Sequence, residues 1–120
     1  MMISLDSISF KYFFKKTKNI SLQKISMKFP DNGMVFLLGP SGSGKTTLLN
    51  IIGGLLDPTS GEIFYGATRL SSLSREQKEL FRLQHFSFIF QENNLVPEYP
   101  VAENLVLSKK IRNETSSKNL

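Results

Sequence analysis

The residues best suited to chemistry lie in one short stretch that is rich in glycine and serine. It reads Gly39-Pro40-Ser41-Gly42-Ser43-Gly44-Lys45-Thr46. It fits G-x-x-x-x-G-K-S/T in every fixed position, a pattern whose backbone N–H groups turn inward and cradle phosphates. In such a loop Lys45 reaches the outer phosphates of a nucleotide triphosphate, and Thr46 offers its hydroxyl to Mg²⁺, a hard cation suited to oxygen ligands. The stretch therefore predicts a nucleotide triphosphate site.

A strand before this loop and a helix after it would position the cradle. Residues 34–38 are five apolar residues without alternation, which is typical of a strand covered on both faces in a parallel sheet. Apolar residues then recur at helical spacing from residue 46 to residue 56, and Asp57 and Pro58 end the pattern. This helix would add the positive end of its dipole to the site. The order strand, loop, helix predicts an α/β fold.

Two strands are predicted ahead of the loop. Residues 3–10 and 22–29 alternate irregularly between apolar and polar, and the lysine-rich stretch between them predicts a basic loop or hairpin. The net charge of the chain is +5, and the whole excess lies in residues 1–28. Such a patch could face anionic lipid, RNA or phosphates, but a solvated hairpin is the favoured interpretation. No nucleic-acid partner is therefore expected.

The residues after the phosphate loop predict several further elements. Ser74, with Gln77 three residues later, forms a capping box that opens a helix. The other expected elements are a short strand over 62–65, an apolar strand over 86–90, a helix over 101–107 and a polar, frayed tail over 108–120.

Length and composition exclude several classes of protein. The 120 residues suit a single domain, and the chain has no cysteine and one histidine. Disulfide scaffolds, thiolate metal sites and cysteine nucleophiles are therefore excluded. No apolar stretch is long enough for a membrane span, and the start does not have the pattern of a secretory signal. We expect a cytosolic chain.

Several segments beyond the phosphate loop carry a resemblance to a known family. They are Leu38-Gly39-Pro40-Ser41-Gly42-Ser43-Gly44-Lys45-Thr46-Thr47-Leu48-Leu49-Asn50, Gly53-Gly54-Leu55, Pro58-Thr59-Ser60-Gly61-Glu62-Ile63, Phe88-Ile89-Phe90-Gln91, Asn94-Leu95-Val96-Pro97, Val101 and Glu103-Asn104-Leu105. Residues 2 to about 107 resemble the first half of the nucleotide-binding domain of ATP-binding cassette (ABC) transporters. They look most like the short ATPase subunits of lipoprotein-release, macrolide-export and antimicrobial-peptide transport systems.

The resemblance implies a fold and a division of the chain. The fold is α/β: a P-loop NTPase with an incomplete RecA-like core and the N-terminal antiparallel β subdomain of ABC ATPases. Residues 1–107 would form a partial nucleotide-binding domain that holds the Walker A motif and the Q-loop, and residues 108–120 the tail.

The resemblance also implies a set of site residues. The cofactors would be ATP and Mg²⁺, bound by the phosphate loop extended to Thr47, with Lys45 also in a catalytic role. Tyr12 would stack on adenine, with Phe13 or Phe14 as register alternatives and packing on the core as the structural alternative. Gln91 would contact Mg²⁺ or the attacking water. Glu92 is not expected to be the general base, because the family supplies that carboxylate elsewhere. His85 is not expected to be the family's switch histidine, because it precedes the apolar strand instead of following a second one.

Partners follow from the same resemblance. Residues 95–107, Leu95 to Leu107, resemble the region that docks a membrane-spanning permease subunit, with a merely packed loop and helix as the alternative. A second ATP-binding subunit would complete a dimer. The protein would then be cytoplasmic and peripheral on the inner face of the cell membrane.

The chain carries no L-S-G-G-Q-like signature, no second apolar strand ending in Asp-Glu and no downstream switch histidine. We expect it to bind ATP and to hydrolyse it for transport only when these elements are supplied, because phosphoryl transfer depends on positioned groups. The alternative is a truncated stand-alone nucleotide-binding or interaction module without ATPase activity. Residues 34–38 would present an unpaired apolar edge, so the isolated chain should be marginally stable, sticky, or dependent on a partner that supplies the rest of the domain.

Overall fold

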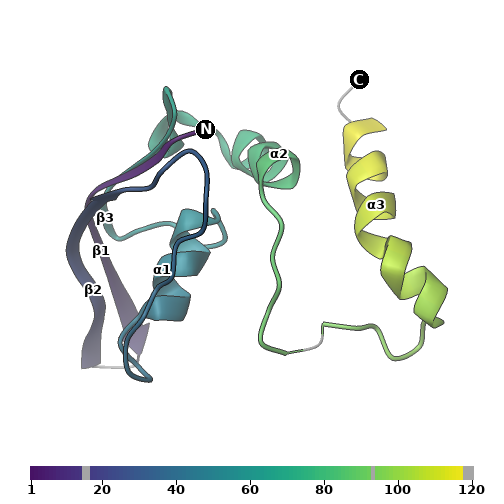
Figure 1. The fold of residues 1–120 in the computed structure, drawn as a ribbon, viewed down its shortest axis with the longest axis horizontal. Coiled ribbons are helices and arrows are strands. Elements are labelled where there is room, and N and C mark those ends of the chain that lie inside the picture. The colour runs from purple at the N-terminus through teal and green to yellow at the C-terminus, as the bar shows by residue number, and fades with distance from the viewer. Residues whose placement is uncertain (15–16, 93, 118–120) are drawn as a thin grey trace. The chain divides into compact units, whose positions relative to one another are not determined.

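A computed structural model describes residues 1–14, 17–92 and 94–117 of the chain. Two compact units are present, Met1–Glu79 and Leu80–Leu120. The elements in chain order (Figure 1) are β1 (Ile3–Phe14), β2 (Thr17–Lys28), α1 (Lys45–Ile52), β3 (Ser60–Tyr65), β4 (Thr68–Arg69), the 3₁₀ helix η1 (Leu70–Ser72), α2 (Arg75–His85) and α3 (Val101–Ser117).

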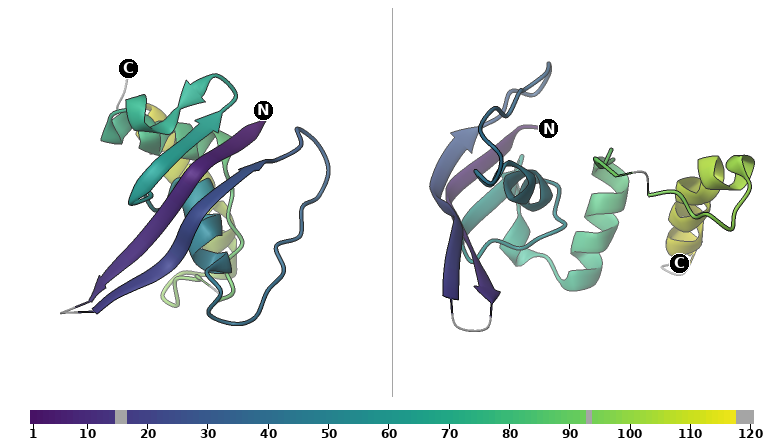
Figure 2. Two further views of the ribbon diagram at one scale, coloured as in Figure 1. Left: turned by 90° about the vertical axis from the view of Figure 1, so that its left-hand side faces the viewer. Right: turned by 90° about the horizontal axis from the view of Figure 1, so that it is seen from below.

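The first unit is built on an antiparallel sheet. Its strand order is β2-β1-β3-β4, and every neighbouring pair is antiparallel (Figure 2). The strands β1 and β2 pair from Ser4↔Lys28 to Phe14↔Thr17, with irregular register between Leu5 and Lys11. The predicted hairpin and the short strand predicted over 62–65 are therefore confirmed. Lys15 and Lys16, within the predicted basic connection, lie outside the described residues.

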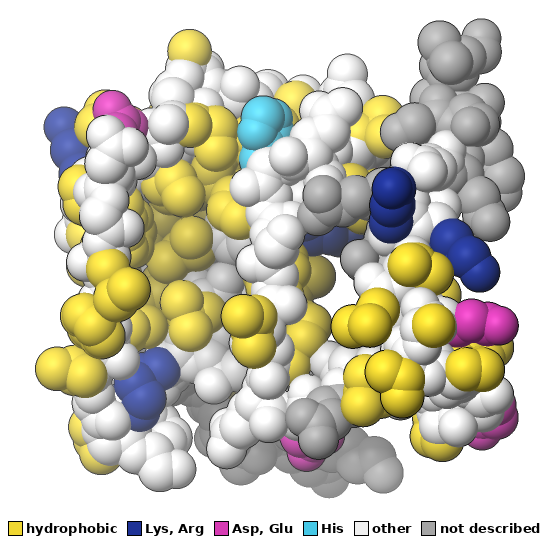
Figure 3. Space-filling model, turned by 45° about the vertical axis from the view of Figure 1, so that its right-hand side comes forward, with side chains coloured by type: hydrophobic (Ala, Val, Ile, Leu, Met, Phe, Trp, Pro, Cys, Tyr) yellow, Lys and Arg dark blue, Asp and Glu magenta, His cyan; other side chains and the backbone are white. Residues whose placement is uncertain are grey.

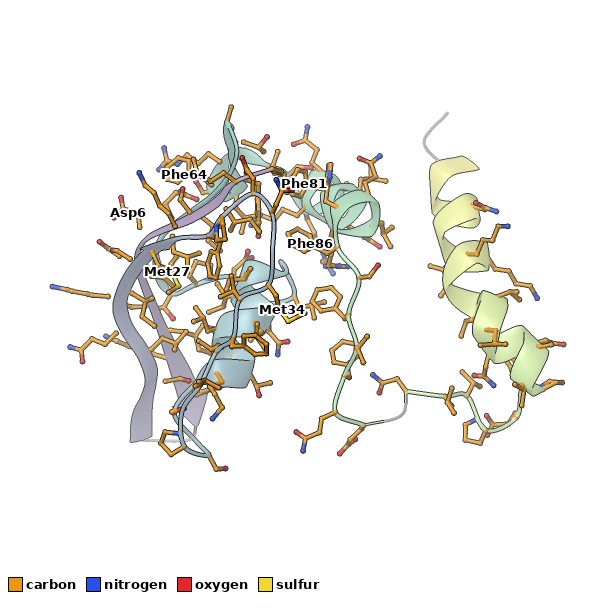
Figure 4. The ribbon with its side chains drawn as sticks, viewed as in Figure 1. Asp6, Met27, Met34, Phe64, Phe81 and Phe86 are labelled. Carbon is orange, nitrogen blue, oxygen red and sulfur yellow. The ribbon has the colours of Figure 1, made fainter. Side chains whose placement is uncertain are left out.

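The core of this unit lies between the sheet and α1. The helix covers one face of the sheet (Figure 1), and Asp6 lies on the opposite face (Figure 4). The buried apolar residues are Leu5, Ile8, Leu22, Leu48, Ile51, Ile63, Tyr65 and Leu70. The Tyr65 hydroxyl donates a hydrogen bond of 2.6 Å to the carbonyl of Ile52. Burial, and secondarily the charge of Asp57, raises the pKa of Tyr65. This bond joins β3 to the last residue of α1.

The strand predicted over residues 34–38 does not form in the structure. The segment has no regular secondary structure, and no parallel pair occurs among the described strands. Met34 (labelled in Figure 4), Phe36 and Leu38 are 78%, 73% and 87% exposed. A strand covered on both faces needs neighbours that pair with its backbone. The prediction of a buried strand was therefore wrong for this chain, whereas the expectation of an unpaired apolar segment is confirmed.

The helix after the phosphate loop is shorter than the sequence predicted. Gly53 N donates to Leu49 O at 2.9 Å, and Gly54, with a φ of +71°, donates to Ile51 O at 3.1 Å. A glycine in the left-handed region commonly ends an α-helix. The helix therefore ends at Ile52 rather than at residue 56.

The predicted capping box of α2 is confirmed. Gln77 N donates to Ser74 Oγ at 3.2 Å, and Ser74 N donates to Gln77 Oε1 at 2.8 Å. These reciprocal bonds satisfy backbone donors at the start of a helix.

The second unit differs from expectation at two places. Residues 86–90 are not a strand, although three alternate phenylalanine rings, those of Phe86, Phe88 and Phe90, stack along the segment with centroids 6.5 and 5.7 Å apart. The helix predicted over 101–107 forms, but α3 continues to Ser117 through residues that the sequence assigned to a polar tail. Residues 118–120 of that tail lie outside the described residues.

A carboxylate holds the corner between β3 and η1. Glu62 Oε2 accepts hydrogen bonds from Arg69 Nε at 2.7 Å and from Ser71 Oγ at 2.5 Å, and Glu62 Oε1 accepts one from Ser71 N at 3.2 Å. Desolvation raises the pKa of Glu62, but the hydrogen bonds from Ser71 and Arg69 outweigh it and lower the pKa from 4.5 to about 2. The charged form is therefore favoured by folding.

This shift predicts an acid-dependent contribution to stability. A carboxyl whose pKa is depressed by folding stabilises the fold above its ordinary value of 4.5, and that stability is lost as the pH falls towards 2. Between about pH 5 and pH 2, the melting temperature of Glu62→Gln should fall less than that of the unsubstituted chain. The reason is that the glutamine has no carboxylate to protonate in this range. Circular dichroism of both proteins across this range checks it. Parallel pH profiles would contradict the role of Glu62.

Candidate phosphate-binding site

The loop from Gly39 to Gly44 connects the apolar segment 34–38 to the first residue of α1. Gly42 and Gly44 have φ angles of +78° and +94°, a region of backbone conformation that favours glycine. Ser43 N donates to Pro40 O at 3.2 Å and closes a turn within the loop. Gly44, a fixed position of the motif, and Gly42, a variable one, therefore both lie where the backbone favours glycine.

The end of the loop packs closely against the hairpin. A Cβ atom at Gly44 would lie 2.7 Å from Ser21 O and 2.8 Å from Leu22 Cδ2. A Cβ atom at Gly42 would meet no atom within 4 Å. Gly44 thus fixes the start of α1 on β2, whereas Gly42 faces open space.

The side chain of Lys45 bends back over the loop. Its Nζ donates to Gly39 O at 2.5 Å, to Pro40 O at 2.6 Å and to Ser43 Oγ at 3.3 Å. The ion pairs formed within the described residues do not include Lys45. The ammonium charge therefore lies over the loop without a carboxylate to neutralise it.

The first turn of α1 suits an anion. Gly44 caps the helix without a side-chain hydrogen bond, and the first turn contains no acidic residue. The N–H groups there have no intrahelical partner, and the dipole places positive charge at this end. Thr46 is exposed and Thr47 is buried. Together with Lys45, this donor set fits a polyphosphate, and the exposed Thr46 hydroxyl fits a hydrated Mg²⁺ ion, which would neutralise phosphate charge when bound.

Tyr12 lies within reach of this site. Its hydroxyl is 3.1 Å from Thr47 Oγ1, and its ring meets that of Phe10 edge-on, with centroids 4.9 Å apart. The Tyr12 side chain is 38% exposed. The structure therefore brings Tyr12 against the first turn of α1, which forms part of the candidate phosphate site. The side chains of the two alternatives, Phe13 and Phe14, lie outside the described residues.

Sequence reasoning missed Ser21. Its Oγ donates to Thr47 Oγ1 at 3.2 Å, and its backbone carbonyl faces Gly44. A serine in an alternating strand belongs to no motif, and its importance depends on which helix packs against that strand. No signal in the spacing could have found it.

The three remaining residues considered from the sequence, His85, Gln91 and Glu92, all lie in the second unit. Gln91 and Glu92 are exposed after segment 86–90. His85, the last residue of α2, is exposed and its ring lies 4.3 Å from that of Phe81. Contact of Gln91 with Mg²⁺ or water stays a prediction.

Comparison with known proteins decides the family. Residues 22–120, which are more than half of the chain, match the family described as ABC transporter. The chain belongs to the ABC transporter ATP-binding family. The resemblance stated from its motifs is therefore confirmed.

No helix within the described residues is both long and apolar enough to cross a membrane.

Curated relatives support the same family. An uncharacterized ABC transporter ATP-binding protein of Methanocaldococcus jannaschii is 40% identical over 92 residues, which are 77% of this chain and 41% of that protein. The lipoprotein-releasing system ATP-binding protein LolD of Buchnera aphidicola is 39% identical over 114 residues, which are 91% of this chain and 50% of LolD. The chain thus spans about half the length of the curated relatives it matches.

Solved structures confirm the fold class. The dimeric post-hydrolysis state of the ATP-binding cassette MJ0796, bound to ADP and Pi, is similar with a TM-score of 0.83 and 30% identity over 92% of this chain and 47% of that chain. A second dimeric structure of the same cassette gives a TM-score of 0.84 and 31% identity. This member of the ABC transporter family therefore has the α/β cassette fold in part, including the antiparallel β subdomain.

The contrast between the two loop glycines gives a test of this geometry. Gly42→Ala should destabilise the fold by about 1–2 kcal/mol, because a side chain is strained at a positive φ. Gly44→Ala carries the same strain and also overlaps Ser21 and Leu22, which should cost roughly 1–3 kcal/mol more. Urea unfolding followed by circular dichroism measures both. Equal losses in the two variants would contradict the close packing of Gly44 on β2.

Proposed function

We propose that this chain binds ATP with Mg²⁺ on residues 39–47 and is the ATP-binding part of an ABC transporter. The observation that carries the proposal is a start of α1 with no side-chain cap, together with the Lys45 ammonium group over the loop, which forms no ion pair within the part of the chain that the structure describes. Backbone N–H groups and one cation facing the same space suit a polyanion. Family membership supports ATP as that polyanion.

Each residue of the proposed site has a distinct role. Lys45 exchanges its bonds to the loop carbonyls for bonds to the outer phosphates, and Thr46 gives its hydroxyl to the metal ion. Tyr12 offers a flat ring to adenine, because a π face accepts a purine without hydrogen bonds. Gln91 contacts Mg²⁺ or the attacking water. Lys45 and Gln91 are the proposed catalytic residues.

Hydrolysis is proposed only for the completed ATPase. Phosphoryl transfer needs a group that orients water and further contacts that hold the metal, and the motifs that supply these in the family are not in this sequence. This chain therefore contributes the phosphate cradle, and turnover coupled to transport follows when the signature and Walker B elements are added. A nucleotide-binding module without ATPase activity is the expected behaviour of the chain by itself.

Two partners are proposed, a second ATP-binding subunit and a membrane permease. The permease would dock on the surface around α3, where the Asn104 side chain accepts a hydrogen bond from Val96 N at 2.8 Å and donates to Tyr99 O at 2.9 Å. Apolar side chains gather there beside acidic ones (Figure 3). Exposed apolar residues of this region are Leu95, Tyr99, Val101, Leu105 and Val106. Such docking would place the protein on the inner face of the cell membrane.

Removal of the ammonium group tests the proposed site. Lys45→Ala should weaken ATP binding at least about tenfold, because a charge-assisted hydrogen bond contributes ~1.5–3 kcal/mol. Isothermal titration calorimetry in the presence of Mg²⁺ measures the affinity. Lys28→Ala, which removes an exposed lysine at the end of β2, is the matched control and should bind as the unsubstituted chain does. Equal affinity of the Lys45 variant and the control would refute the proposal.

A further inference from the structure

Three hydroxyl groups from three elements meet beside the phosphate loop. Thr47 Oγ1, in the first turn of α1, lies 3.1 Å from the Tyr12 hydroxyl of β1 and accepts a hydrogen bond of 3.2 Å from Ser21 Oγ of β2. Thr47 is only 7% exposed. The hydroxyl of Thr47 therefore faces the hairpin and connects both of its strands to the helix.

Two contacts hold the Tyr12 side chain in place, one at its hydroxyl and one at its ring. The hydroxyl end is held by Thr47, and the ring packs edge-on against Phe10 at an interplanar angle of 81°. Ser21 Oγ donates a hydrogen bond to the same Thr47 oxygen, and Ser21 also lies against Gly44. The position of the ring is thus set relative to the start of α1, where the phosphate-binding N–H groups are.

We propose that Ser21 and Thr47 are positioning residues for base recognition. They hold the Tyr12 ring at a fixed place beside the phosphate loop, so that a purine and its phosphates are bound together without first ordering the ring. The inference rests on the proposed function, because it requires that the loop binds phosphates. Ordering a side chain in advance removes part of the entropy cost of binding.

Two ligands separate base recognition from phosphate binding. ATP engages both the ring and the loop, whereas inorganic tripolyphosphate engages the loop alone. Thr47→Val and Ser21→Ala should weaken Mg²⁺-dependent ATP binding roughly three- to tenfold, the range expected for one side chain that must now be ordered on binding. Because Ser21 lies outside residues 39–47, the affinity of Ser21→Ala for tripolyphosphate should remain within about twofold of that of the unsubstituted chain. Calorimetric titration of each protein with both ligands gives the comparison.

A matched control and a double variant sharpen the test. Ser26→Ala removes a serine hydroxyl from the same strand, one that accepts a hydrogen bond from Ser7 N at 2.8 Å, and should change neither affinity. Tyr12→Phe keeps the ring and removes its anchor, so it should weaken ATP binding as Thr47→Val does. If Ser21 acts through Thr47 and the Tyr12 hydroxyl, the double variant Ser21→Ala/Tyr12→Phe should be no weaker than either single variant.

The outcomes distinguish this inference from the proposed function. Equal loss of ATP and tripolyphosphate binding in Ser21→Ala would show that Ser21 shapes the loop itself, and additive losses in the double variant would show that it acts apart from Tyr12. Either result overturns the inference and leaves the phosphate site standing. An unsubstituted chain that binds neither ligand overturns both.

Fluorescence gives a readout that a merely structural role would not move. The chain has three tyrosines and no tryptophan, so its emission comes from tyrosine. Saturating ATP should quench this emission more than saturating tripolyphosphate does, and Tyr12→Phe should abolish the difference. The same difference retained in Tyr12→Phe would show that adenine does not stack at this ring.

Discussion

The phosphate loop depends on one close contact between the start of α1 and strand β2. Because Gly44 has no side chain, its backbone lies against Ser21 and Leu22 at distances that a Cβ atom could not occupy. One turn later Leu48 is buried, as is Leu22 on the strand. The hairpin therefore fixes where the helix begins, and with it the direction in which the N–H groups of the first turn point.

The presence or absence of a pairing partner explains why the antiparallel sheet forms and the predicted parallel strand does not. Short connections join β1 to β2 and β3 to β4, and β3 pairs with β1 although the phosphate loop and α1 lie between β2 and β3 in the chain. A parallel strand obtains its neighbours only through long crossover connections. Residues 34–38 have no such neighbour among the described residues and expose their apolar side chains. Exposed apolar surface of this kind favours association, which accords with a chain that spans about half of its relatives.

The same distinction decides how much the sequence could predict. The hairpin, the Ser74–Gln77 capping box and the phosphate loop were predicted because residues close in the chain specify each of them. The apolar runs 34–38 and 86–90 indicated buried strands, but burial also requires partners that no local pattern reveals. At the end of α1 the apolar spacing pointed past Ile52, and the left-handed conformation of Gly54 ended the helix instead. Ser21 could not be found because its role comes from the helix that packs on it.

The ammonium group of Lys45 is bound to the phosphate loop and can still bind an anion. Its ammonium group is already ordered by the carbonyls of Gly39 and Pro40, so little side-chain freedom remains to be lost when an anion arrives. Those carbonyls are neutral acceptors, whereas a phosphate oxygen adds the attraction between opposite charges to the hydrogen bond. Gly39 and Pro40 are also exposed, so water can satisfy their carbonyls once Lys45 has moved. An arriving phosphate therefore replaces weaker bonds of Lys45 by stronger ones without leaving a buried acceptor unsatisfied.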